Sequence, residues 1–213
     1  MNQIGFELNS NSEISRSWLL VNAMHDEQFD VAAKSRADEI ILDVEDAVDP
    51  KFKGEALQKT IAWLNGGGSA WVRINDYTTD FWRQDLDGLK GVSGLKGVML
   101  AKTETASQVT ETYAALGSTL PVIALVESAL GIEDSREIAS AKGAYRLAFG
   151  SGDYRRDTGT SVDDLAMAYP RSKLVVASRI GNLPGPIDGP TVGSNHAVLK
   201  EKSELAVALG MTG

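Results

Sequence analysis

The chain has 213 residues, a formal net charge of -8 and 43% hydrophobic residues, which predicts one globular domain with a substantial core. The acidic balance argues against a general nucleic-acid or anionic-membrane surface, because both partners attract clustered lysine and arginine. Cysteine is absent, which excludes disulfides, thiolate metal sites and a cysteine nucleophile.

Residues 1–15 are polar and mixed, without the basic start and apolar core of a signal peptide. No stretch approaches the roughly 20 apolar residues that a membrane span needs. We therefore expect a cytoplasmic protein with a loose head at residues 1–15, followed by one domain at residues 16–213.

Short apolar runs alternate with longer helical patterns along the rest of the chain. The runs predict strands at residues 17–21, 39–44, 70–75, 97–100, 121–126 and 145–149, and a strand-like piece rich in Pro and Gly at 184–192. The predicted helices cover residues 27–35, 54–65, 81–90, 105–116, 132–141, 161–180 and 196–209. Pro170 is expected to kink or divide the helix that contains it.

Seven β/α units predict a parallel sheet with helices outside it. Their spacing of roughly 30 residues allows a (β/α)8 TIM-type barrel, with reactive groups at the carboxyl ends of the strands. The alternative is an open doubly wound sheet. Against that alternative, no G-x-G-x-x-G follows the first predicted strand and no G-x-x-x-x-G-K-[ST] occurs in the chain.

Acidic residues follow two apolar strands, and a third strand is predicted to run into an acidic loop. The segments are IILDVED at 40–46, PVIALVE at 121–127 and YRLAFGSGD at 145–153. A buried carboxylate is costly unless it is paired, hydrogen-bonded or bound to a cation. Glu127 and Asp153 are the first candidates for metal ligands, and oxygen ligands favour Mg²⁺ over zinc. Spacing alone leaves open a simpler interpretation, in which Glu127 caps a helix and Asp153 forms a turn.

Asp43, Glu45 and Asp46 follow one strand, and Arg73 lies near the end of the next. Asp43 and Glu45 point to the same side of a strand and Asp46 to the other. The first two could hold water on a metal or orient Arg73; a solvated acidic turn is the alternative. Arg73 suits a bidentate grip on a keto or hydroxy acid, and a structural ion pair with Asp43 or Glu45 could coexist with that role.

Lys102 could face the same barrel mouth, although a lone lysine there is more often solvated. His25 and His196 are expected on the surface. Neither histidine is a strong candidate for chemistry.

Several segments, in order, resemble the HpcH/HpaI aldolase and citrate lyase beta-subunit-like family. They are RSWLLVNA at 16–23, ADEIILDVEDAVDPKFK at 37–53, VRIN at 72–75, VMLAKTE at 98–104, ALVESALGI at 124–132, LAFGSGDYRRDTG at 147–159 and PIDGP at 186–190. Because the matches span nearly the whole chain, the resemblance is more specific than any single motif.

The resemblance implies a Mg²⁺-dependent lyase with a (β/α)8 barrel. It would split carbon–carbon bonds in β-hydroxyacyl thioesters of coenzyme A and release a keto acid and an acyl thioester. Glu127 and Asp153 match metal ligands, and Arg73 matches the arginine that holds the acid. Glu45 and Asp46 match acids near the water shell of the metal.

Arg16 matches a family arginine near the acyl-thioester site. The resemblance and the open barrel edges further imply a homo-oligomer, a trimer or a multiple of it. Two alternatives stay open: an aldolase for free pyruvate-derived hydroxy-keto acids, and a catalytically reduced subunit that binds metal and keto acid.

The sequence departs from the family pattern at three places. Ala101 stands where members usually have proline, and Val21-Asn22-Ala23 lacks the usual proline of the first motif. The third departure is that the chain stops where the eighth strand of the family begins. We therefore expect a barrel that lacks this strand and the C-terminal segment that caps a neighbouring site.

Overall fold

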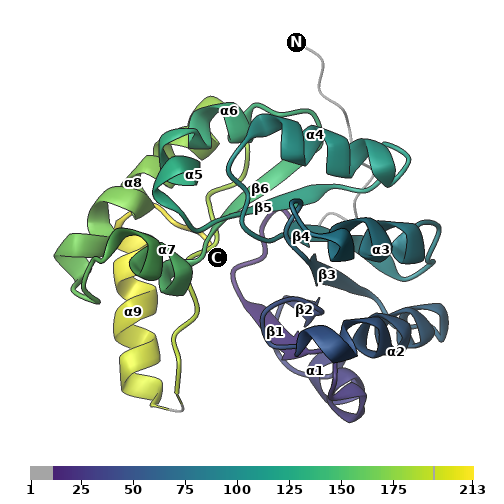
Figure 1. Ribbon diagram of the computed structural model, residues 1–213. Coiled ribbons are helices and arrows are strands. Elements are labelled where there is room, and N and C mark those ends of the chain that lie inside the picture. Colours follow the sequence, from purple (N-terminus) through teal and green to yellow (C-terminus); the bar gives the residue numbers. More distant parts are fainter. Residues whose placement is uncertain (1–11, 194) are drawn as a thin grey trace.

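The computed structural model describes residues 12–193 and 195–213. Its parallel sheet has six strands, each hydrogen-bonded to the next in chain order. They are β1 (Trp18–Asn22), β2 (Glu39–Asp43), β3 (Ala70–Ile74), β4 (Leu95–Leu100), β5 (Val122–Val126) and β6 (Ala144–Phe149). The sheet curves into a half-barrel with the helices on its outer side (Figure 1). A doubly wound sheet reverses its strand order part-way, so the sequential order excludes that alternative.

The two faces of the sheet bury different apolar clusters. The outer face packs against the helices in the larger cluster. The inner face holds a smaller one: Ile41, Trp71, Met99, Ile123, Leu125, Tyr145, Ala148 and Ile187, with Trp18 against them. Because both faces are covered, β2 and β5 are buried along their whole length, as parallel strands usually are.

The helices include α1 (Phe29–Ala33), α2 (Lys53–Asn65), α3 (Asp80–Leu89), α4 (Ala106–Ala115), α5 (Ala129–Glu133), α6 (Ser135–Ala139), α7 (Ser151–Thr158), α8 (Asp164–Ile180) and α9 (His196–Ala208). The short 3₁₀ helices η1 (Asp26–Gln28) and η2 (Pro50–Phe52) precede α1 and α2. Local signals explain several starts. Thr105 and Gln108 form a capping box before α4, and the Asn195 side chain accepts two backbone N–H groups of α9.

The helix predicted at 132–141 is wrong in its start and its continuity. It begins earlier as α5, because the Ser128 side chain caps it by accepting the N–H of Gly131. It ends at Glu133, and α6 starts at Ser135, so that Asp134 alone separates the two helices.

Pro170 does not divide its helix. α8 is continuous from Asp164 to Ile180, and Pro170 is buried within it. Proline removes one backbone hydrogen bond from a helix, but the buried ring contributes apolar contact. Tertiary packing therefore holds α8 together across this position.

The acidic loop predicted after β6 is also wrong. Its residues form α7, so Asp153 lies in the first turn of a helix. Gly159 ends α7 in the left-handed conformation, with φ +71°. Two arginines in the last turn followed by glycine are a sequence signal for a helix end, and this signal could have revealed α7.

The strand-like piece predicted at 184–192 is reduced to one bridge, between Ile187 and Ala148 of β6. The three prolines in this piece have no backbone N–H that could donate a hydrogen bond to a neighbouring strand. The last residues run alongside it, since Thr212 N–H donates to Pro186 and Asp188 N–H donates to Gly213.

Most of the predicted head lies outside the described residues. Ser12 and Ser15, at its end, are buried. Ser12 donates to Glu39, and Arg146 donates to the Ser15 carbonyl. In the described part of the chain, no helix is long and apolar enough to cross a membrane.

Candidate functional site

Polar side chains from the ends of three strands lie at the carboxyl end of the half-barrel, on its inner side. Ile41, Trp71 and Leu125 face the interior cluster. Two residues further along the chain come Asp43, Arg73 and Glu127. Since side chains repeat every second residue along a strand, these three lie above the apolar interior at the same end of the sheet.

Arg73 and Asp43 form a bidentate ion pair between neighbouring strands. The two residues are register partners of β2 and β3, and Nε and Nη2 of Arg73 lie 2.7 and 2.6 Å from the two Asp43 oxygens. Burial disfavours the guanidinium charge, but the hydrogen bonds and charge of Asp43 outweigh it and raise the pKa of Arg73. The structural ion pair is therefore present, and it leaves Nη1 of Arg73 directed elsewhere.

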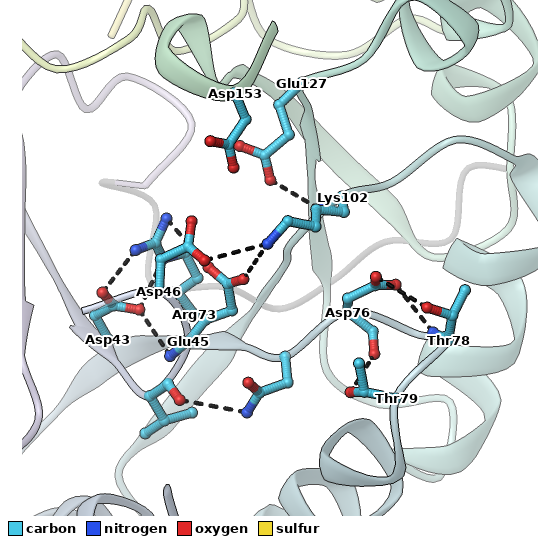
Figure 2. Close-up of polar contacts among 12 residues, drawn as sticks. Asp43, Glu45, Asp46, Arg73, Asp76, Thr78, Thr79, Lys102, Glu127 and Asp153 are labelled. Atoms are coloured by element: carbon cyan, nitrogen blue, oxygen red, sulfur yellow. Dashed lines mark hydrogen bonds and ion pairs between the residues drawn. The ribbon is translucent and has the colours of Figure 1, made fainter. Parts of the chain in front are cut away.

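Glu45 and Asp46 follow in the turn after β2, and both meet Lys102 (Figure 2). The Lys102 Nζ is 2.5 Å from Glu45 Oε1 and 3.2 Å from Asp46 Oδ1. Burial raises the pKa of Glu45, although Lys102 and Arg73 oppose the shift. Because the strand ends at Asp43, its alternation no longer applies, and Asp46 does not point away as predicted. It lines the same cleft as Glu127.

Glu127, directly after β5, and Asp153, in α7, approach each other (Figure 2). Glu127 Oε1 accepts the Lys102 backbone N–H at 2.9 Å, and Asp153 Oδ1 pairs with Arg156. Burial, together with the nearby charges of Asp153 and Glu45, raises the pKa of Glu127 to about 8. The two carboxylates therefore repel each other, and among the described residues no lysine or arginine side chain forms an ion pair with Glu127.

Two hollows meet above the sheet. One has a volume of about 580 Å³, and its lining includes Asp46, Lys102, Glu127, Asp153 and Arg156. The other, of about 250 Å³, shares Asp46, Glu127, Asp153 and Arg156 and adds Arg73. Its floor is apolar: Leu20, Ile41, Met99, Leu125, Ala148 and Ile187. A ligand with an acidic head and an apolar portion would find both environments here.

The donor set fits Mg²⁺ better than a metal with an all-protein cage. Within the described ranges, no group of three or more His, Cys, Asp or Glu could hold a metal ion. Mg²⁺ commonly takes one or two carboxylates and fills its remaining positions with water and substrate oxygens. Glu127 and Asp153 each have a second oxygen without a hydrogen-bonding partner in the described part of the chain, so they offer that arrangement.

A family model of the HpcH/HpaI aldolase/citrate lyase family matches residues 16–213. The chain belongs to this family. Its curated relatives include a (3S)-malyl-CoA thioesterase of Cereibacter sphaeroides, 30% identical over 174 residues that cover 79% of this chain and 60% of the relative. An L-malyl-CoA/beta-methylmalyl-CoA lyase of the same species is 33% identical over 147 residues, 62% of this chain and 46% of the relative. The chain thus spans about half to 60% of the length of these relatives.

Solved structures of the family are similar over nearly all of the chain. A CitE protein from Mycobacterium tuberculosis in complex with magnesium, acetoacetate and coenzyme A has a TM-score of 0.81 and 29% identity, covering 94% of this chain and 75% of that one. A citrate lyase beta subunit from the same species with oxaloacetate and magnesium has a TM-score of 0.77 and 29% identity, covering 93% and 89%.

The structure brings together six of the seven residues predicted for the site: Asp43, Glu45, Asp46, Arg73, Glu127 and Asp153. Arg16 is not among them. It precedes β1 at the opposite, amino end of the strands, and its backbone N–H donates to Asp38. The family-based expectation that Arg16 lies near the acyl-thioester site stays a prediction. The strand predicted at residues 17–21 already placed Arg16 before the amino end of the first strand.

The sequence pattern favoured a solvated Lys102, and it did not predict the hydrogen bonds that support the acidic turn after β2. Lys53 on α2 donates to the carbonyls of Val44 and Glu45, and Asn75 donates to Val44 and Asp85. These contacts join different elements of the chain, and that between Asn75 and Val44 spans 31 residues. Two signals for Lys102 were available: its position just after an apolar strand and its place in the family segment VMLAKTE at 98–104.

Proposed function

We propose that the protein is a Mg²⁺-dependent carbon–carbon lyase for a β-hydroxyacyl-CoA substrate, from which it releases a keto acid and an acyl thioester. The observation that carries the proposal is the convergence of Glu127, Asp153 and Arg73 at one mouth. Family membership supports it, as do relatives that are named for malyl-CoA chemistry. We assign this activity to one domain at residues 16–213 with the architecture of a (β/α)8 barrel that lacks the eighth strand.

Glu127 and Asp153 would hold the metal, each through its free oxygen. When bound, Mg²⁺ supplies Lewis-acid stabilisation of negative charge on substrate oxygens. The apolar floor and the burial of Glu127 reduce the competition of water for this charge. The carboxylate pair in turn gains the cation that its mutual repulsion demands.

Arg73 would hold the carboxylate of the keto-acid portion. Asp43 fixes the guanidinium plane through Nε and Nη2, so Nη1 is oriented before the ligand arrives. A preoriented guanidinium binds a carboxylate without losing much side-chain entropy. It also stabilises negative charge that develops on the departing acid.

The cleavage requires a base for the substrate hydroxyl. As the carbon–carbon bond breaks, the hydroxyl carbon becomes the keto carbonyl, and the electron pair passes to the α-carbon of the thioester, which then takes up a proton. Asp43 is committed to Arg73 through both oxygens. We assign the proton transfers to Glu45 and Asp46, since Glu45 Oε2 has no hydrogen-bonding partner among the described residues.

Replacing Glu127 by glutamine tests the metal assignment. The amide keeps the shape and can accept the Lys102 N–H, but it has no negative charge to hold Mg²⁺. We expect E127Q to lose Mg²⁺-dependent oxaloacetate binding in calorimetry, and the exposed control E137Q on α6 to bind as the wild type does. Unchanged binding by E127Q would rule out this ligand assignment.

A thioester hydrolase is the second candidate, because one relative is named as a malyl-CoA thioesterase. Product analysis with malyl-CoA separates the two, since a lyase yields glyoxylate and acetyl-CoA whereas a hydrolase yields malate and free coenzyme A. Cleavage of free hydroxy-keto acids alone would instead indicate an aldolase that does not use coenzyme A.

We also propose a homo-oligomer, a trimer or a multiple of it. The outer edge of β1 has no strand beside it in the described part of the chain, and Leu19 on β1 is exposed. Such an edge is commonly covered by another segment or subunit. Sedimentation velocity tests this proposal, which a monomer at micromolar concentration would contradict.

A further inference from the structure

We propose that Lys102 is the positioning residue that keeps the acidic turn and the metal-binding pair of this site in a fixed relation. The inference rests on the proposed function, because it assigns a role within that site. Lys102 makes two separate attachments, one through its backbone and one through its ammonium group.

The backbone attachment depends on a conformation that side chains rarely adopt. Lys102 has φ +50°, in the left-handed region that disfavours residues with a Cβ. Its neighbours enter different ladders, since Ala101 N–H donates to Ile74 of β3 and Thr103 N–H donates to Leu125 of β5. The Lys102 N–H between them turns to Glu127 Oε1. Strain of this kind persists where surrounding contacts fix it, commonly at functional sites.

The ammonium attachment reaches across the site to Glu45 and Asp46. Glu45 is buried, and the Lys102 Nζ at 2.5 Å is the nearest cation that the described residues offer it. Arg73 is the next, with Nη1 at 3.6 Å from Glu45 Oε2 and no hydrogen bond between them.

This arrangement explains how Lys102 acts on ligand binding without contacting the ligand. Two of its three ammonium donors are already directed to carboxylates. Without the ammonium, Arg73 is the cation nearest to the Glu45 carboxylate among the described residues, since Lys53 reaches the backbone carbonyl of Glu45 instead, and the attraction draws Glu45 to Nη1. Nη1 is the guanidinium nitrogen that we assign to the carboxylate of the substrate. Lys102 therefore keeps Nη1 available by holding Glu45 itself.

The alternatives are a solvated surface lysine and a lysine that binds the ligand directly. The Lys102 side chain is 38% exposed, so both are physically accessible. The test uses K102M and K102N, which lack the ammonium; asparagine tolerates the left-handed backbone better than most residues. K102R retains a cation, and K90M at an exposed position after α3 is the matched control.

Two titrations separate the attachments. In calorimetry with pyruvate and saturating Mg²⁺, we expect K102M and K102N to bind about tenfold more weakly, as loss of a charged hydrogen bond allows. Mn²⁺ binding followed by electron paramagnetic resonance should change less than about twofold, because both retain the backbone N–H to Glu127. K102R should stay within about threefold of wild type for pyruvate, and K90M should match wild type.

A double-mutant cycle then decides whether Lys102 acts through Glu45. If it does, adding K102M to E45Q causes no further loss of pyruvate binding, because the neutral amide is no longer drawn to Arg73. If K102M weakens pyruvate binding by the same factor in E45Q as in wild type, Lys102 contacts the ligand directly, and the inference is overturned. Wild-type pyruvate affinity in K102M and K102N would also overturn it. A wild-type protein that binds pyruvate with no Mg²⁺ dependence would instead overturn the proposed function, and the inference with it.

Discussion

At the scale of single residues, the pairing of Asp43 with Arg73 decides which substitutions at the site are informative. Asp43 is fully buried, and Arg73 satisfies both of its oxygens. Removing one member of a buried ion pair costs about 3–5 kcal/mol, because the other charge is left uncompensated. A truncation of Arg73 would therefore confound folding with function, whereas a lysine keeps the charge.

We expect R73K to fold but to lose activity. The ammonium can stay near Asp43, but it lacks the planar fork that engages Asp43 and a substrate carboxylate together. Steady-state kinetics with malyl-CoA should show kcat/KM reduced by about 100-fold, or ~2.7 kcal/mol of transition-state stabilisation. Thermal unfolding monitors the fold, and R83K on the exposed face of α3 is the control. Equal kcat/KM for R73K and wild type would show that Arg73 does not bind the substrate.

At the scale of elements, the beginning of α7 is shaped around Glu127. Gly150 precedes α7, and its N–H donates to Val126 at the end of β5. A Cβ at Gly150 would lie 2.1 Å from Glu127 Oε2, far inside van der Waals contact. The absence of a side chain at Gly150 is thus what lets the strand end and the helix start approach closely enough to place Glu127 beside Asp153.

The substitution G150A should weaken metal binding. The new methyl group must displace the Glu127 carboxylate, and we expect the Mn²⁺ dissociation constant to rise at least about tenfold, equivalent to ~1.4 kcal/mol. Gly152 is a matched control in the same segment, because a Cβ there has no neighbour within 4 Å. Paramagnetic resonance titration of both variants makes the comparison. Equal weakening in G150A and G152A would point to a general effect on α7.

At the scale of the whole molecule, a buried polar network ties the acidic turn to the outer helices. Asp85 of α3 accepts the backbone and side-chain N–H groups of Asn75, and Asn75 also donates to Val44. Burial raises the pKa of Asp85 to about 6, although these hydrogen bonds and Lys53 oppose the shift. A carboxyl group with a raised pKa in the folded state binds its proton more tightly there than in the unfolded chain. Its contribution to stability is therefore lost as the pH rises from about 4 through 6.

We expect D85N to remove this pH dependence. Relative to wild type, the free energy of unfolding of D85N should rise by up to about 3 kcal/mol between pH 4 and pH 7, since one pKa unit corresponds to ~1.4 kcal/mol. Urea unfolding at several pH values measures the difference. D87N, at an exposed position of the same helix, should show no such trend. A D85N difference that is independent of pH would contradict the assignment.

The sequence by itself determined the alternation of strands and helices, the parallel barrel-like class and six of the residues now found at one end of the sheet. It could do so because strand burial and the two-residue alternation are local properties. Only the tertiary structure decided that Asp46 lines the same cleft as Glu127, that Lys102 pairs with Glu45 and Asp46, and that Gly150 makes room for Glu127. Those facts depend on turns and on contacts between segments distant in the chain, which no local pattern records.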